Sequence, residues 1–273
     1  SGKELPTATV NIGDIANPFI APLRVVCEKI GARAYVQGPN STNQDAVRWR
    51  AVTAGARIFP IDPKGIKYAD GSQQPVSLVP VFAGVRARVV NGAEGVSGSV
   101  TNKPILTLDG VTREVRYPDD SNYLLSNQVN TVINRNGLHT WGDYLATDDP
   151  IWMIDSVRAT ADVINDQIHD LYMRHIGRRY TAGNLKNLVE DGNAAMRDYT
   201  LQGHILGGSV KLGSANTATQ GVQGRVFLDI EFEPVGRISD IDIATHRNIM
   251  RYQLVIDTVN GLIENGALGS LAA

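Results

Sequence analysis

The residues from His139 to Ile164 are the ones whose types and spacing could do chemistry. This span holds one histidine, five aspartates, two tryptophans and one arginine. Carboxylates beside a histidine can bind a metal ion or transfer protons. A metal-dependent hydrolase would use His139, Asp148 and Asp149 in this way, and metal analysis of the purified protein would test that interpretation.

The start of a helix explains the same aspartates without catalysis. Asp148 and Asp149 stand directly before Pro150. An aspartate N-cap followed by proline at the first helical position is a typical helix start. The spacing therefore predicts a long helix from Pro150, with Asp155 and Asp162 on its outer side.

Apolar residues recur along this predicted helix at helical spacing. The stripe consists of Ile154, Val157, Ala161, Ile164, Ile168, Leu171 and Ile176. Asp166 falls on the outer side with the other helical aspartates. Trp141 and Trp152 are interpreted as core anchors beside the helix start, which makes the acidic span structural.

No other motif indicates a catalytic, cofactor or metal site. The run Gly207–Gly213 lacks the spacing of a phosphate-binding loop and is predicted to be a hairpin turn. The five histidines include no pair with metalloprotease spacing. No histidine precedes His139, so the first half lacks the general base of a subtilisin-type triad. The sequence therefore predicts a protein that is not an enzyme and has no cofactor.

Composition narrows the class further. The 273 residues suffice for about two domains, and a net charge of −2 argues against a general nucleic-acid binder. Cys27 is the single cysteine, and no apolar run approaches the roughly 20 residues that span a bilayer. The first residues lack a signal-peptide pattern, and Ser1-Gly2 resembles a cloning remnant, so we expect the natural protein to begin earlier.

Residues 1–126 alternate between helix and strand, which predicts an α/β fold with a mostly parallel sheet. Helices are predicted at 18–31, 43–55 and 75–90, and strands at 32–37 and 57–61. The stretch 91–120, rich in Gly, Ser and Thr, is predicted to form small strands and loops at the rim of the sheet. A domain change is expected near Asn122–Asn127.

Residues 127–273 are predicted to form a smaller α+β domain. Its predicted elements are a hairpin around the Asn136-Gly137 turn, the long helix, a helix over 184–203, and strands over 204–213 and 224–236. An apolar segment over 247–273 ends in a Gly/Ala-rich tail.

The run from Asn130 to Asp162 resembles the signature of contractile phage tail sheath proteins. The matching residues are Asn130, Thr131, Gly137, Trp141, Gly142, Asp148, Asp149, Pro150, Arg158, Thr160 and Asp162. The Arg-Thr pair that often follows Trp-Gly in the family is Asp143-Tyr144 here. Other similar runs include "VCEKIGARAYV", "VTNKPI" and "GRVFLDIEFEPV", so the resemblance covers almost the whole chain.

This resemblance implies a structural protein of a contractile tail. Residues 1–126 would be a non-proteolytic, subtilisin-like sheath domain, partial at its N-terminus. Residues 127–273 would be the C-terminal sheath domain with a C-terminal arm. Copies would polymerise into a helical sheath around the tail tube and contract, driving the tube through the host envelope for genome ejection.

The implied partners are other copies of the chain, the tail tube protein, and the baseplate and tail terminator proteins. No nucleic acid and no membrane insertion would be involved, and the protein would belong to a virion assembled in the cytoplasm of a host bacterium. The sheath of an R-type bacteriocin or of a type VI secretion-like system is the alternative.

Two surfaces are candidates for contacts between proteins. Apolar residues of the C-terminal segment would form an inter-subunit arm that adds to a neighbour's sheet, as the family does. The alternative is a terminal helix packed on its own domain. The arm candidates are Ile249, Tyr252, Leu254, Ile256 and Val259. Basic residues after the long helix would face the tube, with helix-dipole compensation as the alternative. The tube-facing candidates are Arg174, Arg178 and Arg179.

Overall fold

The computed structural model describes residues 12–14 and 17–264. Ser1-Gly2 and the end of the Gly/Ala-rich tail lie outside the described residues. The chain divides into two compact units, Ser1–Arg237 and Ile238–Ala273, and each is described by itself.

The first unit opens with the βαβ arrangement that the sequence predicts. In chain order the elements are η1 (Ile12–Asp14), α1 (Ile20–Ile30), β1 (Ala34–Gln37), α2 (Asn43–Thr53) and β2 (Ile58–Ile61). β1 and β2 pair in parallel, with Ala34 opposite Ile58. α1 ends at Gly31, whose left-handed backbone (φ 63°) suits glycine.

The mixed α/β class is confirmed, but the predicted mostly parallel sheet is not. β3 (Gly65–Ala69), β4 (Ser72–Val76) and β5 (Gly110–Val111) form an antiparallel sheet in the order β4-β3-β5. Among the described strands, only β1 and β2 pair in parallel. Strands joined by tight turns cannot pair in parallel, because a parallel partner needs a long crossover.

The sequence pattern does not predict β3 and β4. Their side chains are mostly exposed and polar, so the alternation that marks a half-buried strand is absent. They are joined by a tight turn at Asp70-Gly71, and both of its residues have positive φ.

The segment after β4 folds over the parallel strands. It contains α3 (Val79–Val90), η2 (Gly95–Ser97), α4 (Asp119–Ser126), β6 (Thr131–Asn134) and β7 (Leu138–Trp141). β6 and β7 form the predicted hairpin, and the turn residues Asn136 and Gly137 have φ of 57° and 116°. Asn130, just before β6, extends the parallel arrangement by bridging to Ile61.

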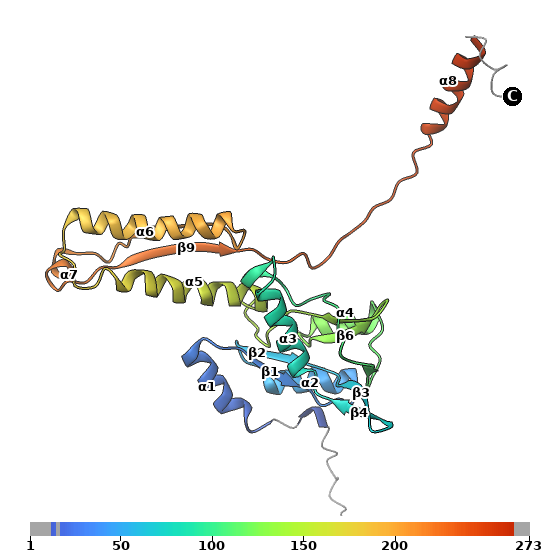
Figure 1. Cartoon of the computed structure of the whole chain (residues 1–273), viewed down its shortest axis with the longest axis horizontal. Coiled ribbons are helices and arrows are strands. Elements are labelled where there is room, and N and C mark those ends of the chain that lie inside the picture. Colours follow the sequence, from blue (N-terminus) through green and yellow to red (C-terminus); the bar gives the residue numbers. More distant parts are fainter. Residues whose placement is uncertain (1–11, 15–16, 265–273) are drawn as a thin grey trace, which may run out of the picture. The chain divides into compact units, whose positions relative to one another are not determined.

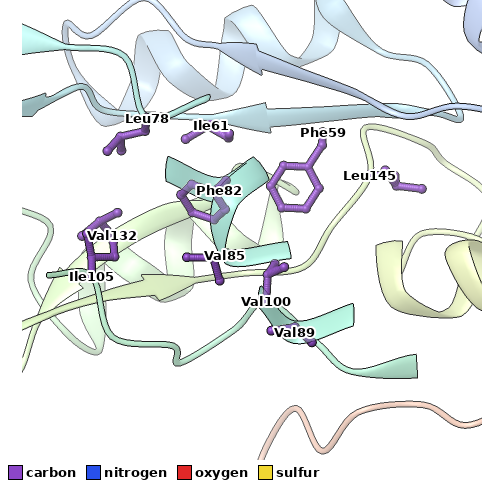
Figure 2. Close-up of a cluster of buried hydrophobic side chains, with 10 residues drawn as sticks. All are labelled: Phe59, Ile61, Leu78, Phe82, Val85, Val89, Val100, Ile105, Val132 and Leu145. Atoms are coloured by element: carbon purple, nitrogen blue, oxygen red, sulfur yellow. The ribbon is translucent and has the colours of Figure 1, made fainter. Parts of the chain in front are cut away.

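One buried cluster holds this part of the fold together (Figure 2). Its members are Phe59, Ile61, Leu78, Phe82, Val85, Val89, Val100, Ile105, Val132 and Leu145. The rings of Phe59 and Phe82 lie 5.7 Å apart between centroids. Val132 and Leu145 follow the expected boundary at residue 126, and their side chains pack in the same cluster as β2 and α3. The division into residues 1–126 and 127–273 stays a prediction.

A second cluster forms in the helix-and-hairpin module of the first unit. We use this name for α5 (Asp155–Met173), α6 (Ala182–Leu201), β8 (Ile205–Leu212), α7 (Ala218–Val222) and β9 (Leu228–Pro234). β9 runs between α5 and α6 in Figure 1 and pairs antiparallel with β8. The cluster is built from Ile164, Ile168, Met196, Ile205 and Val210.

β9 is the half-buried strand that the sequence predicts. Leu228, Ile230 and Phe232 pack against the second cluster, whereas the intervening acidic side chains are exposed. Gly207–Gly213 lies mostly within β8, so the predicted turn at this run is wrong. The first unit closes at Arg237, whose guanidinium carbon lies 4.8 Å from the centroid of the Tyr144 ring.

The second unit contains α8 (Arg251–Glu264), and the apolar side chains of this helix are largely exposed. The predicted apolar segment is therefore helical over these residues. None of the helices in the described ranges is long and apolar enough to cross a membrane.

We predict that Asn130→Ala destabilises the fold. The Asn130 side chain is fully buried; its Nδ2 donates to the carbonyls of Pro60 (2.9 Å) and Tyr144 (2.7 Å), and its Oδ1 accepts the Tyr144 N–H (2.8 Å). Removing the amide leaves buried backbone groups unpaired, which should lower the free energy of unfolding by about 2–3 kcal/mol. Urea denaturation would measure the change. Asn187→Ala, at an exposed position of α6, is the control and should change stability by less than about 0.5 kcal/mol.

Candidate functional site: a buried charge cluster and an open groove

The long helix begins later than the sequence predicts. α5 starts at Asp155, and residues 150–152 form turns. The Asp149 carboxylate accepts the N–H of Ile151 at 3.0 Å, so it closes a turn and does not cap the helix. Leu145 donates its N–H to the Met153 carbonyl and Asp155 to the Asp143 carbonyl, and Tyr144 and Ile154 form an antiparallel bridge. Ile154 is therefore extended, and the chain between the paired residues forms a loop. The predicted helix start at Pro150 is therefore wrong.

Asp155 is buried, which corrects its predicted place on the outer side of the helix. Its side chain is fully enclosed, and its Oδ1 lies 2.7 Å from Nε of Arg33. Its Oδ2 lies 4.0 Å from Nε of Arg86. Asp143 is also fully buried and accepts a hydrogen bond from the Ser156 hydroxyl at 2.8 Å.

Asp162 lies two turns further along α5 and forms the strongest pair. Both nitrogens of the Arg57 fork donate to its two oxygens, at 2.6 and 2.9 Å, and Arg33 lies 3.4 Å away. A bidentate guanidinium–carboxylate pair combines a charge-assisted bond with fixed geometry. The predicted outer position of Asp162 is wrong as well, since its side chain is 17% exposed.

Together these residues form what we call the charge cluster: Arg33, Arg57, Arg86, Asp143, Asp155 and Asp162. The arginines come from the starts of β1 and β2 and from α3, and the aspartates from the loop after β7 and from α5. Burying charges costs free energy that pairing only partly recovers, so such clusters favour one defined geometry more than they add stability. The charge cluster fixes the start of α5 against the parallel strands.

Burial shifts the pKa values of the two fully buried carboxyls, Asp143 and Asp155, upward. Desolvation, reinforced by the charge of Asp155, raises the pKa of Asp143 to about 7, against the Ser156 hydrogen bond. Burial also raises the pKa of Asp155, opposed by Arg33 and Arg86. Asp143 is therefore a proton-binding group near neutral pH.

The sequence pattern does not single out the cluster's arginines. A signal for two of them exists, because the tripeptide Gly-Ala-Arg precedes each parallel strand, at Gly31–Arg33 and Gly55–Arg57. Parallel neighbours begin at the same edge of a sheet, so two arginines at equivalent positions must lie close together.

Other signature residues play local roles around the cluster. Gly142 has φ 111°, and a Cβ there would lie 2.5 Å from the Asn130 Oδ1. Arg158 stacks over the Trp152 ring at 5.2 Å, and the Thr160 hydroxyl donates to the Ser156 carbonyl. Trp141 makes an edge contact with Tyr117. Neither tryptophan belongs to the buried core, so both are half-buried supports and not core anchors.

The residues of the hydrolase alternative are occupied elsewhere. Asp148 pairs with Arg50 at 3.1 Å and is largely exposed, and Asp149 closes its turn. His139 lies on β7, with Nδ1 3.0 Å from the Gly137 carbonyl. Within the described ranges, no three His, Cys, Asp or Glu side chains gather in a way that could hold a metal ion.

The tube-facing candidates lie at the far end of α5, beside a groove of about 470 Å³. Arg174 pairs with Asp191 at 3.3 Å, and the buried His175 contacts the same carboxylate at 2.9 Å. Arg178 and Arg179 are exposed and line the groove. Its floor comes from α5, α6 and β9.

Comparisons of the sequence with known proteins give three relatives that are all named tail sheath proteins. No protein-family model matches the chain. It is 28% identical over 218 residues to a putative prophage major tail sheath protein of Pseudomonas aeruginosa, covering 77% of this chain and 56% of that protein. It is 24% identical over 250 residues to the major tail sheath protein of Serratia phage KSP20, covering 88% and 63%. It is 23% identical over 166 residues to the tail sheath protein of Escherichia phage P2, covering 59% and 42%.

Solved structures show the same fold. The sheath complex of an extracellular contractile injection system (PVC), in the contracted state, superimposes with a TM-score of 0.74 at 18% identity, covering 86% of this chain and 70% of that one. The contracted helical sheath of the anti-feeding prophage gives 0.72 at 16% identity, covering 84% and 65%.

The fold is thus that of the subunits that build contractile sheaths. The sequence relatives are named tail sheath proteins of phages and a prophage, so the predicted resemblance to tail sheath proteins is confirmed. The chain spans 42–63% of the length of these relatives.

We predict that Asp143 makes stability fall as pH rises from about 4 to 7. Its folded-state pKa is about 7 and its unfolded value about 3.9, so in this window the folded protein holds a proton that the unfolded chain has lost. The contribution is therefore present at low pH and lost as pH passes the folded pKa. In urea denaturation, Asp143→Asn should gain stability relative to the wild type as pH rises to about 8. Asp166→Asn, on the exposed side of α5, is the control, and parallel curves for wild type and Asp143→Asn would contradict the assignment.

Proposed function

We propose that this chain is a subunit of a contractile tail sheath, which polymerises around a tail tube and contracts to drive the tube through a host envelope. The observation that carries the proposal is the 28% identity with a prophage tail sheath protein over 218 residues. The sheath-like fold supports it. The protein would act mechanically, in a virion assembled in the cytoplasm of a host bacterium, and not as an enzyme.

A related machine is the second candidate. The structural neighbours include sheaths of the anti-feeding prophage and of an extracellular contractile injection system, which share the fold at 16–18% identity. A bacteriocin or secretion-type sheath would use the same subunit with a different payload. Capsid genes beside the gene for this protein would favour the phage tail.

The finer fold assignment also belongs to this proposal. We assign residues 1–126 to a subtilisin-like sheath domain and residues 127–273 to the C-terminal sheath domain. The parallel β1–α2–β2 unit and the parallel bridge between Ile61 and Asn130 support a subtilisin-like arrangement. Proteolysis is not expected, because no histidine precedes His139.

The charge cluster gives the subunit a way to transmit force. It ties α5, and with it the helix-and-hairpin module, to the starts of the parallel strands through two hydrogen bonds and an ion pair with N···O distances of 2.6–2.9 Å. A subunit pulled at either end would then move as one body, and its contacts with neighbours would change instead of its fold.

Contacts between subunits would use the C-terminal segment. Ile249, Tyr252, Leu254, Ile256 and Val259 are 43–64% exposed. Exposed apolar surface of this extent marks a binding segment. The tail tube would meet the basic loop of Arg174, Arg178 and Arg179, and baseplate and terminator proteins would meet the sheath ends.

We predict that ending the full-length protein after Arg251 abolishes polymerisation and leaves a folded monomer. The deletion removes most of α8 and its exposed apolar residues, whereas both buried clusters lie in the first unit. Electron microscopy would detect sheath tubes, and circular dichroism would check the fold. Ending the chain after Glu264 is the matched control and should preserve tubes. Tubes of normal appearance from the shorter protein would refute the arm.

We predict that Arg178→Glu with Arg179→Glu prevents assembly of the sheath on the tail tube. Reversing two exposed charges replaces attraction to an acidic tube surface with repulsion, and the effect should weaken as salt rises. Co-sedimentation of sheath with purified tubes would measure it. Lys29→Glu with Lys67→Glu reverses two exposed charges elsewhere and should leave assembly intact. Unchanged sheath–tube assembly of the arginine variant would discard the assignment.

A further inference from the structure

α8 is an amphipathic helix whose apolar side is exposed. Tyr252, Ile256, Val259 and Ile263 follow one another at steps of four, three and four residues, and they are 64, 51, 43 and 57% exposed. Residues at this spacing lie on one face of a helix. Ile249, three residues before Tyr252, continues the same spacing. Such a stripe is stable in water only when another surface covers it.

An acidic edge runs beside this stripe. Asp257 and Glu264 are seven residues apart, so they lie above one another on the helix. Gln253, one turn earlier, donates to the Asp257 carboxylate at 2.9 Å. The helix therefore presents an apolar face with negative charge on one side. Arg251, which begins the helix, lies on the other side, and the guanidinium carbon of Arg247 lies 5.9 Å from the centroid of the Tyr252 ring.

The groove beside β9 in the first unit has the complementary chemistry. Ile168 and Tyr172 of α5, Leu185 and Leu188 of α6, and Val226 before β9 provide an apolar floor. Arg178 and Arg179 supply positive charge, and no acidic side chain is among the described residues that line it. Its volume of about 470 Å³ suits a few anchoring side chains.

We propose that α8 of a second copy docks in this groove as a helix, with its apolar stripe on the groove floor and its acidic edge toward Arg178 and Arg179. The choice of a second copy as the occupant rests on the proposed function, in which copies of the chain polymerise. Apolar shape and opposite charge act together here, as in other complexes of a helix with a groove. In this arrangement Arg178 and Arg179 bind α8, so they would not at the same time contact the tail tube.

The position of Leu254 distinguishes docking of the C-terminal segment as a helix from its pairing as a strand. In a strand, Tyr252, Leu254 and Ile256 would share one face, because side chains alternate with a period of two. In a helix of 3.6 residues per turn, Leu254 points away from the stripe that contains Ile256 and Val259. Docking as a helix therefore needs Val259 and not Leu254, and docking as a strand needs the reverse pattern.

Disulfide trapping between two single-site variants tests the docking. Val259→Cys chains are mixed with Leu188→Cys chains and oxidised, and Leu254→Cys mixed with Leu188→Cys is the matched control. Leu254 is more exposed than Val259 (61 against 43%), so random collision favours the control. The native Cys27 is buried and present in every sample. Because a disulfide forms only between closely approaching side chains, we expect about five-fold more cross-linked dimer with Val259→Cys.

Equal or greater cross-linking of Leu254→Cys would overturn helical docking, as would no cross-link with either. A further variant carries both Val259→Cys and Leu188→Cys in one chain. An intramolecular disulfide in this variant, together with no cross-link between mixed chains, would place the helix in its own groove and overturn the second copy as occupant. Tubes from the full-length protein alongside any of these results would leave the sheath function standing and reject only the docking.

Discussion

The structure depends on the pairing of Asp155 and Asp162 with Arg33, Arg57 and Arg86 where α5 meets the parallel strands. Burying a carboxylate away from water costs free energy unless a partner compensates its charge. Each of these aspartates is therefore stable in its position only while the arginines stay in theirs. The pair of Arg57 and Asp162 has the most constrained geometry, because two nitrogens of the planar guanidinium donate to both carboxylate oxygens. The helix-and-hairpin module therefore has a fixed direction relative to the sheet, although its own apolar cluster is separate from that of Phe59 and Phe82.

The same constraint explains which parts of the fold can be predicted from the sequence. Elements with a clear period, such as α6, β9 and the β6–β7 hairpin, follow from spacing alone. The start of α5 does not. The local pattern Asp-Asp-Pro is a sound helix start, but antiparallel pairing of residues 143–145 with 153–155 keeps Ile154 extended and leaves Asp-Asp-Pro in a loop. A long-range contact overrides the local preference there.

The candidate site shows a similar limit. Asp155 and Asp162 look like solvent-facing helix residues, because charged side chains off an apolar stripe usually are. Each aspartate pairs with an arginine that lies more than a hundred residues earlier in the chain: Asp155 with Arg33, and Asp162 with Arg57. Only these long-range pairs make the two aspartates part of the interior. The repeated Gly-Ala-Arg tripeptide is the one trace of this arrangement in the sequence, and its meaning depends on knowing that β1 and β2 are parallel neighbours.

The stacking of Arg237 on Tyr144 sets a length scale for the proposed inter-subunit arm. It fixes the point at which the chain leaves the first unit, and 13 residues (238–250) then separate that point from α8. A fully extended segment of this size reaches roughly 45 Å. Within that radius the tether keeps the local concentration of α8 high, and beyond it engagement is impossible. In the proposed sheath, the tether would therefore limit how far two joined subunits can travel apart while their connection survives a change of lattice.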